Sequence, residues 1–304
     1  MIKKFLYEKY GEFVTDKLLT GSNEVIWENY NENGNIEQDE VKKHLKSLND
    51  IDGKPLLPET FWRKDVEWGV DFSGWIGEVS NKDFFIIGAE PHIWKNYQLV
   101  YDFGNLKDKS VEESAMEHYN RKDDIWYYLT NTFIDSKSPK DITNFLKKCY
   151  ITDLCHIVPK KCGQISAICE HLEISATEWQ SFRKSVAERF LKEEIRTVNP
   201  KVVILHGNPS RYFFRDEFNI TDYHIYKIED SKYTIQTWSF DQRTVISIPH
   251  LKGSMKNMLW KCKKFPNRQE SAKKIINKIV TSHSSPSSPL SISAQSHSTS
   301  SNPT

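Results

Sequence analysis

The chain has 304 residues and a formal net charge of +1, so it is long enough for one large hydrophobic core with additions. The near-zero net charge excludes a globally basic nucleic-acid binder, and any contact with nucleic acid must come from local charge. The five cysteines do not indicate a secreted disulfide scaffold. With no apolar stretch of about 18 residues and no signal-peptide pattern, we expect a cytoplasmic protein without membrane contact.

Three regions follow one another along the chain. Residues 1–80 are expected to form a helical N-terminal extension, with helical patterns at 3–19 and 37–48. Residues 81–280 are expected to form the main domain. Residues 281–304 are rich in Ser, Pro and His, a composition typical of disorder.

Strand and helix patterns alternate through the main domain. The apolar run at 84–87 is typical of a strand covered by helices on both faces. Helical patterns at 108–148 and 177–197, a hairpin at 224–238 and a closing helix at 268–280 follow. Three further strands are predicted, ending near Asp153, His206 and His250. This order predicts an α/β fold, a three-layer α/β/α domain with a central, mostly parallel sheet.

A stiff turn follows the first strand. Residues 88–92 read Gly-Ala-Glu-Pro-His, which places Glu90 at a strand's carboxyl end, where ligand sites of open α/β sheets lie. Pro91 disfavours the helical conformation at Glu90 and holds the carboxylate in this turn. A surface turn whose Glu only faces solvent is the alternative.

Four segments, in order, resemble motifs of the uracil-DNA glycosylase superfamily. Residues 88–92 resemble the motif that reads Gly-Gln-Asp-Pro-Tyr-His or Gly-Glu-Ala-Pro-Gly, and residues 150–153 are similar to a Tyr-Ile-Thr-Asn segment. Residues 199–208 resemble a Lys-Pro-Lys-Val-Ile-Val-Leu-Leu-Gly-Asn strand, and residues 249–250 resemble the start of a His-Pro-Ser motif. Coincidental matches rarely preserve both order and strand context.

The resemblance implies a monofunctional DNA glycosylase that flips a base out of the stack and hydrolyses its N-glycosidic bond. In such an enzyme Glu90 would stabilise the sugar cation and orient a water, and His250 would donate a hydrogen bond to the base O2. Phe103 would stack on the base, and the backbone N–H near Ala89 would bind a base carbonyl. Plain core for Phe103 and a structural role for His250 are the alternatives. The resemblance implies no metal or other cofactor.

Asp153 departs from the family, which has Asn in this slot. An Asn amide matches uracil, whereas an ionised Asp only accepts hydrogen bonds and favours an exocyclic amine such as N4 of cytosine. Because excision of ordinary cytosine would destroy the host genome, we expect a modified cytosine, hydroxymethylated or glucosylated as in phage DNA, and a role in phage defence. His92, where one branch has Tyr, could contact a C5 substituent or be a loop residue. One alternative is that Asp153 is a strand-end turn residue and that Asn208 or a backbone group reads the base. Uracil repair is the other alternative.

Residues 251–256 follow His250 and carry part of a local basic patch. Leu251 could enter the gap left by the flipped base. Three residues could contact phosphates: Lys252, Ser254 and Lys256. A basic loop that faces solvent is the alternative.

DNA is the expected partner and the chain is expected to be a monomer. Two other classes stay open, a nucleic-acid-binding module without catalysis and an α/β enzyme acting on a small molecule. His156 and His206 also end strands, but neither aligns with the family's catalytic histidine. Four cysteines lie six or seven residues apart, and we expect no metal cluster there: Cys149, Cys155, Cys162 and Cys169.

Overall fold

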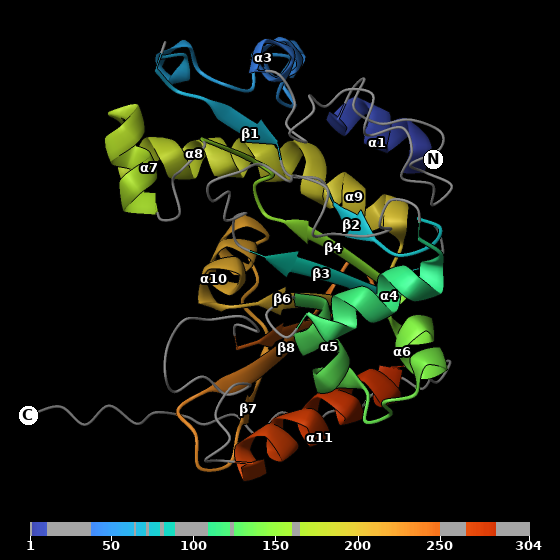
Figure 1. Cartoon of the computed structure of the whole chain (residues 1–304). Coiled ribbons are helices and arrows are strands. Elements are labelled where there is room, and N and C mark those ends of the chain that lie inside the picture. Colours follow the sequence, from blue (N-terminus) through green and yellow to red (C-terminus); the bar gives the residue numbers. More distant parts are fainter. Residues whose placement is uncertain are drawn as a thin grey trace, which may run out of the picture.

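A seven-stranded sheet lies at the centre of the part of the chain that the structure describes (Figure 1). In the computed structural model this part comprises residues 2–10, 38–63, 65–70, 73–79, 82–88, 109–121, 125–159, 165–249 and 266–283. The strands of the sheet are β2 (Gly74–Trp75), β3 (Phe84–Gly88), β4 (Cys149–Asp153), β6 (Val202–His206), β7 (His224–Lys227), β8 (Thr234–Phe240) and β9 (Arg243–Ile248). They lie in the order β2-β4-β3-β6-β9-β8-β7.

The four central strands of this sheet are parallel and its edges are antiparallel. β3 and β6 are buried almost throughout, as expected for strands with helices on both faces. The prediction of an α/β fold with a parallel centre is therefore confirmed. The predicted hairpin at 224–238 is β7 and β8, and it extends the same sheet through β9.

Helices cover both faces of the sheet (Figure 1). Among the described residues they are α1 (Ile2–Tyr10), α3 (Gln38–Ser47), α4 (Val111–Asn120), α5 (Ile125–Phe133), α6 (Pro139–Leu146), α7 (Ile165–Leu172), α8 (Ala176–Val186), α9 (Lys192–Val198), α10 (Asn208–Glu217) and α11 (Pro266–His283). A π-helical segment at Ala187–Leu191 joins α8 to α9. The helical patterns predicted at 108–148 and 177–197 are confirmed as α4 to α6 and as α8 with α9.

Two helix starts are fixed by capping boxes. At the start of α4, Glu113 N–H donates to Ser110 Oγ at 3.2 Å, and Ser110 N–H donates to the Glu113 carboxylate at 2.7 Å. Ser175 and Glu178 repeat this exchange at the start of α8, at 3.1 and 2.8 Å. Both pairs satisfy backbone donors that the first helical turn leaves free.

Each face of the sheet has its own hydrophobic core. Phe85 and Ile87 of β3 pack into one core with side chains of α1, α3, α7, α8, α9 and α10, and we call this side the α9 face. Ile86 packs into the other core with side chains of α4, α5, α6 and α11, and we call this side the α5 face. The alternation follows the two-residue period of a strand. The three-layer α/β/α arrangement is thus confirmed.

Residues before β3 take part in two sheets. β2 pairs with β4 at the edge of the large sheet, and β1 (Trp68–Val70) pairs with β5 (Ile157–Pro159) in a separate two-stranded sheet. The expected extension therefore supplies an edge strand that the sequence patterns do not predict. The domain boundary at residue 80 stays a prediction.

The last described helix, α11, extends to His283. The disorder predicted from residue 281 is therefore wrong for residues 281–283, which continue this helix, and residues 284–304 lie outside the described residues. No helix within the described ranges is long and apolar enough to cross a membrane.

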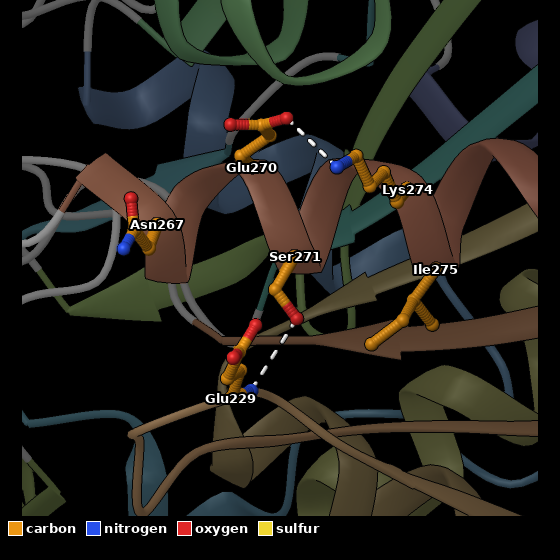
Figure 2. Close-up of a pocket in the computed structure, with 6 residues that line it drawn as sticks. All are labelled: Glu229, Asn267, Glu270, Ser271, Lys274 and Ile275. Carbon is orange, nitrogen blue, oxygen red and sulfur yellow. Dashed lines mark hydrogen bonds and ion pairs between the residues drawn. The ribbon is translucent and has the colours of Figure 1, made fainter.

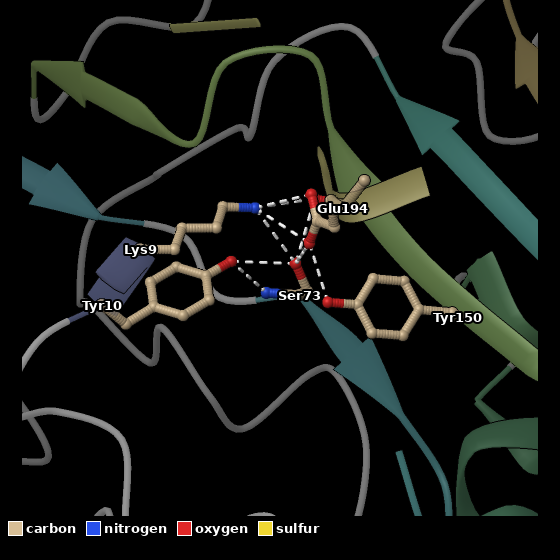
Figure 3. A network of polar contacts seen from close by, with 6 residues as sticks. Lys9, Tyr10, Ser73, Tyr150 and Glu194 are labelled. Atoms are coloured by element: carbon tan, nitrogen blue, oxygen red, sulfur yellow. Dashed lines mark hydrogen bonds and ion pairs between the residues drawn. The ribbon is translucent and has the colours of Figure 1, made fainter. Parts of the chain in front are cut away.

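A buried ion pair ties α1 to α9 (Figure 3). Lys9 Nζ lies 2.9 Å from Glu194 Oε2, and both side chains are 1% exposed. Ser73 Oγ donates to Glu194 Oε1 at 2.6 Å, and Tyr150 OH donates to the same oxygen at 2.7 Å. The Tyr10 hydroxyl shares a hydrogen bond of 2.8 Å with Ser73 Oγ. Thr152 Oγ1 donates to Glu194 Oε2 at 3.4 Å, so the carboxylate is held by one cation and three hydroxyl donors, which offsets the cost of burying the charge.

Candidate functional site

Three neighbouring strands end at one level of the sheet. Gly88, the last residue of β3, lies opposite Asp153, the last residue of β4. On the other side of β3, Ile87 lies opposite Leu205, so His206 at the end of β6 reaches the level of Gly88. Ligand sites of open α/β sheets lie at this carboxyl edge.

Asp153 and His206 face the same side of the sheet. Ile151 and Ile204 belong to the core of the α5 face, and strand residues two positions apart share a face. Asp153 and His206 follow them by two residues in β4 and β6. Gly88 follows Ile86 in the same way. The backbone of this glycine, which carries no side chain, therefore lies between the side chains of Asp153 and His206.

The space above Gly88 is filled from both neighbouring strands. A Cβ placed on Gly88 would collide with Asp153 Oδ1 and would lie 3.2 Å from His206 Nε2. Since β4 and β6 are separated by β3, their backbones lie roughly 10 Å apart, and only side chains that lean inward can meet above it. Glycine is required here for close approach, because any side chain would displace the carboxylate.

Hydrogen bonds on the other face hold β4 in position beneath this edge. Thr152, the residue before Asp153, is 4% exposed and faces the α9 side. Its Oγ1 donates to Glu194 Oε2 at 3.4 Å and lies 3.0 Å from Ser73 Oγ and 3.4 Å from Lys9 Nζ. The buried ion pair of α1 and α9 therefore supports the strand that carries Asp153.

His206 is fixed at the turn into α10. It is 7% exposed, and its backbone carbonyl accepts a hydrogen bond from Ser210 Oγ at 3.3 Å. Gly207 N–H donates to Ile248 O at 3.0 Å, and a φ of 97° at Gly207 turns the chain away from the sheet. The left-handed conformation favours glycine at this position.

Two of the predicted site residues, Asp153 and Asn208, lie in the described part of the chain. Asn208 is exposed and begins α10, which packs on the α9 face through Phe213 and Phe214. Its role in reading the base stays a prediction. The remaining predicted site residues lie outside the described residues: Ala89, Glu90, His92, Phe103, His250, Leu251, Lys252, Ser254 and Lys256.

His156 has a structural environment. It is 2% exposed and packs edge-on against Tyr10 and Phe190, with ring centroids 5.6 and 5.1 Å away. Burial, with the charges of Lys9 and His44, lowers the pKa of His156 well below its usual value. The imidazole is therefore neutral at physiological pH and belongs to the core of the α9 face.

The described residues form no cluster of potential metal ligands. Within them, no group of three or more His, Cys, Asp or Glu side chains could hold a metal ion. A polar recess lies along α11, beside Glu229 (Figure 2). Glu229 N–H donates to Ser271 Oγ at 3.3 Å, and Lys274 pairs with Glu270 at 2.8 Å. This recess contains none of the predicted site residues.

His206 is the site residue that the motif comparison passed over. The family segment has Leu at this position, so the resemblance gave His206 no role. The signal was nonetheless in the sequence, because Asp153 and His206 both follow a buried strand and both lie two residues after an isoleucine.

Comparison with known proteins agrees with this geometry. No curated protein matches the chain. The model of a family described as the uracil DNA glycosylase superfamily matches residues 78–279, a range that contains β3, β4, β6 and β9. Because the match covers more than half of the chain, this protein belongs to the uracil-DNA glycosylase superfamily.

Proposed function

We propose that the chain is a monofunctional DNA glycosylase that releases a modified cytosine from DNA and leaves an abasic site. Membership of the superfamily supports a DNA glycosylase in general. The observation that carries the choice of base is the Asp153 carboxylate, which lies against Gly88 at the start of the first family motif. Hydroxymethylated or glucosylated cytosine is the substrate class that this reading favours.

The chemistry of a carboxylate supports cytosine over uracil. An ionised carboxylate accepts hydrogen bonds and donates none. It therefore attracts the N4 amine of cytosine and repels the O4 carbonyl of uracil. An amide in the same place offers both a donor and an acceptor, which suits N3–H and O4 of uracil. Asp153 in place of the family's Asn thus favours a base with an exocyclic amine.

The reaction would use residues that flank the described strand ends. Glu90, two residues after Gly88, would orient a water toward C1′ and stabilise the positive charge that grows on the sugar. His250, two residues after Ile248, would donate a hydrogen bond to the base O2 as negative charge grows there. The water oxygen bonds to C1′ while the bond to the base nitrogen breaks, and the base leaves with a proton.

Three further contacts would hold the substrate. Phe103 would stack on the flipped base. Leu251 would enter the gap in the stack. Lys252, Ser254 and Lys256 would contact the phosphates that flank it. These assignments rest on the resemblance of the motifs.

The choice of base also suggests the biological role. Ordinary cytosine is a normal base of the host genome, so an enzyme that removes cytosine must require a modification that the host lacks. Phage DNA carrying hydroxymethylated or glucosylated cytosine would meet this requirement. A role in antiviral defence is therefore part of the proposal.

Alkaline cleavage of end-labelled duplexes tests the proposal. The duplexes carry uracil, 5-hydroxymethylcytosine, glucosylated hydroxymethylcytosine or cytosine at one position, and Glu90→Gln is the control for catalysis. Cleavage at a modified cytosine that Glu90→Gln abolishes supports the proposal. Cleavage at uracil alone would indicate that the protein acts in uracil repair. DNA binding without cleavage of any duplex identifies a binding module.

A further inference from the structure

We infer that His206 is a second base-reading residue, which forms with Asp153 a paired donor and acceptor across Gly88. The inference rests on the proposed function, because it assigns a role within the same base-binding site. It adds a residue that the family motifs do not provide, since the matching family segment has Leu where this chain has His206.

The sheet brings the two side chains together. Asp153 and His206 end the two strands that flank β3, and both face the α5 side. Asp153 Oδ1 occupies the Cβ position above Gly88, and His206 Nε2 lies 3.2 Å from that position. The carboxylate oxygen and the imidazole nitrogen therefore lie close enough together for one edge of a flat base to meet both.

Both residues are held in place by the surrounding structure. His206 is 7% exposed, and the residues on either side of it are held by β6 and by the turn into α10. Asp153 follows Thr152, whose side chain is held on the other face by its contacts with Ser73 and Glu194. Because both backbones are fixed by the sheet, the two side chains are preorganised for a ligand.

The two side chains are chemically complementary to one edge of cytosine. A carboxylate alone can bind the N4 amine of cytosine but would face the N3 lone pair with another lone pair. An imidazole Nε2–H supplies the missing donor to N3. With His206 present, Asp153 can read cytosine in its ionised form.

The side-chain length at position 206 provides a sharp test. Gln places its terminal amide near the Nε2 position of His206, whereas Asn is shorter and does not reach it. His206→Gln and His206→Asn therefore differ in reach and not in polarity. His156→Gln is the matched control, because His156 is also buried near β4 but packs on the α9 face against Tyr10 and Phe190.

The experiment measures single-turnover cleavage of the four duplexes by the full chain and the three variants, with melting temperatures as a check on folding. We expect His206→Asn to lower kcat/KM for the preferred base roughly 10- to 100-fold, as for loss of one hydrogen bond in a buried site. His206→Gln should retain most of the wild-type kcat/KM, and His156→Gln should have the same kcat/KM as the wild type. Equal activity of His206→Asn and wild type would overturn the inference, and so would equal losses in both His206 variants.

The outcome also separates this inference from the proposed function. If the wild type releases uracil and no modified cytosine, the proposed substrate is wrong, and the role of His206 is decided by the same variants on uracil. If the wild type releases no base, glycosylase activity is excluded, and the variants are compared by their affinity for the four duplexes. Loss of base discrimination in His206→Asn alone would then support the reading role, and unchanged discrimination would overturn it.

Discussion

The buried ion pair between Lys9 and Glu194 gives a direct test of how the N-terminal helix is attached. Substitution of Lys9 by Met keeps the length of the side chain and removes its charge. The Glu194 carboxylate would then stay buried, with Ser73, Tyr150 and Thr152 as its remaining donors at 2.6, 2.7 and 3.4 Å. An uncompensated buried charge costs roughly 3–5 kcal/mol of unfolding free energy. The three hydroxyl donors should keep Lys9→Met near the lower end of that range.

A double-mutant cycle isolates the interaction. Glu194→Gln keeps an oxygen acceptor for Ser73 and Tyr150 but leaves the Lys9 ammonium without its counter-charge. The double variant contains no buried charge, so it should be more stable than the sum of the two single changes predicts, by at least about 2 kcal/mol. Urea unfolding measures all four free energies. Lys274→Met, which breaks the exposed pair with Glu270, is the control and should change the stability very little.

The pH dependence adds an independent check. Burial alone would lower the pKa of Lys9, but the Glu194 carboxylate and Tyr10 outweigh it and raise this pKa to about 12. The stabilisation is therefore complete below the unfolded-state pKa near 10.5 and is lost as the pH rises toward 12. Lys9 contributes about 2 kcal/mol to this loss, so the alkaline loss of stability should be smaller by about that amount in Lys9→Met. Additive single changes, or equal alkaline losses in both proteins, would refute the reasoning.

Three other predictions concern single positions. Gly88→Ala places a Cβ where Asp153 Oδ1 lies, so it should destabilise the fold by roughly 1–3 kcal/mol and reduce base release; unchanged melting and cleavage would contradict the close approach. Asp153→Asn restores the family's amide, so the ratio of kcat/KM for uracil to that for modified cytosine should rise at least about 10-fold in the duplex assay; an unchanged ratio would show that Asp153 does not read the base. Burial lowers the pKa of Lys82 to about 8, so the unfolding free energy should increase by up to about 3 kcal/mol between pH 8 and 10.5. Lys82→Met should lose this increase, and an equal increase in both proteins would assign the effect to another group.

The central strands could be predicted because their sequences carry the signal. β3 and β6 are apolar runs, and they end at a glycine and at a histidine. A strand that is buried on both faces carries apolar side chains at nearly every position, so its sequence shows a continuous apolar run. β1 and β2 were missed because Trp68–Val70 and Gly74–Trp75 are too short for any periodicity. Their pairing with β5 and β4 depends on the folded domain and is not encoded locally.

The site shows the same division between local and long-range information. Gly88, Asp153 and His206 could each be placed at a strand end from local sequence, because each follows a buried run. Their meeting above one glycine depends on the strand order, with β3 between β4 and β6, which no local pattern specifies. The ion pair between Lys9 and Glu194 joins residues 185 positions apart and left no local trace.

The central claim is that this protein releases a modified cytosine as a free base. The most direct measurement is mass spectrometry of the small molecules released from DNA in which cytosine, 5-hydroxymethylcytosine, glucosylated hydroxymethylcytosine and uracil are present together. We predict release of a modified cytosine by the wild type, with cytosine retained and no release by Glu90→Gln. Release of uracil alone, or equal release by Glu90→Gln, would contradict the claim.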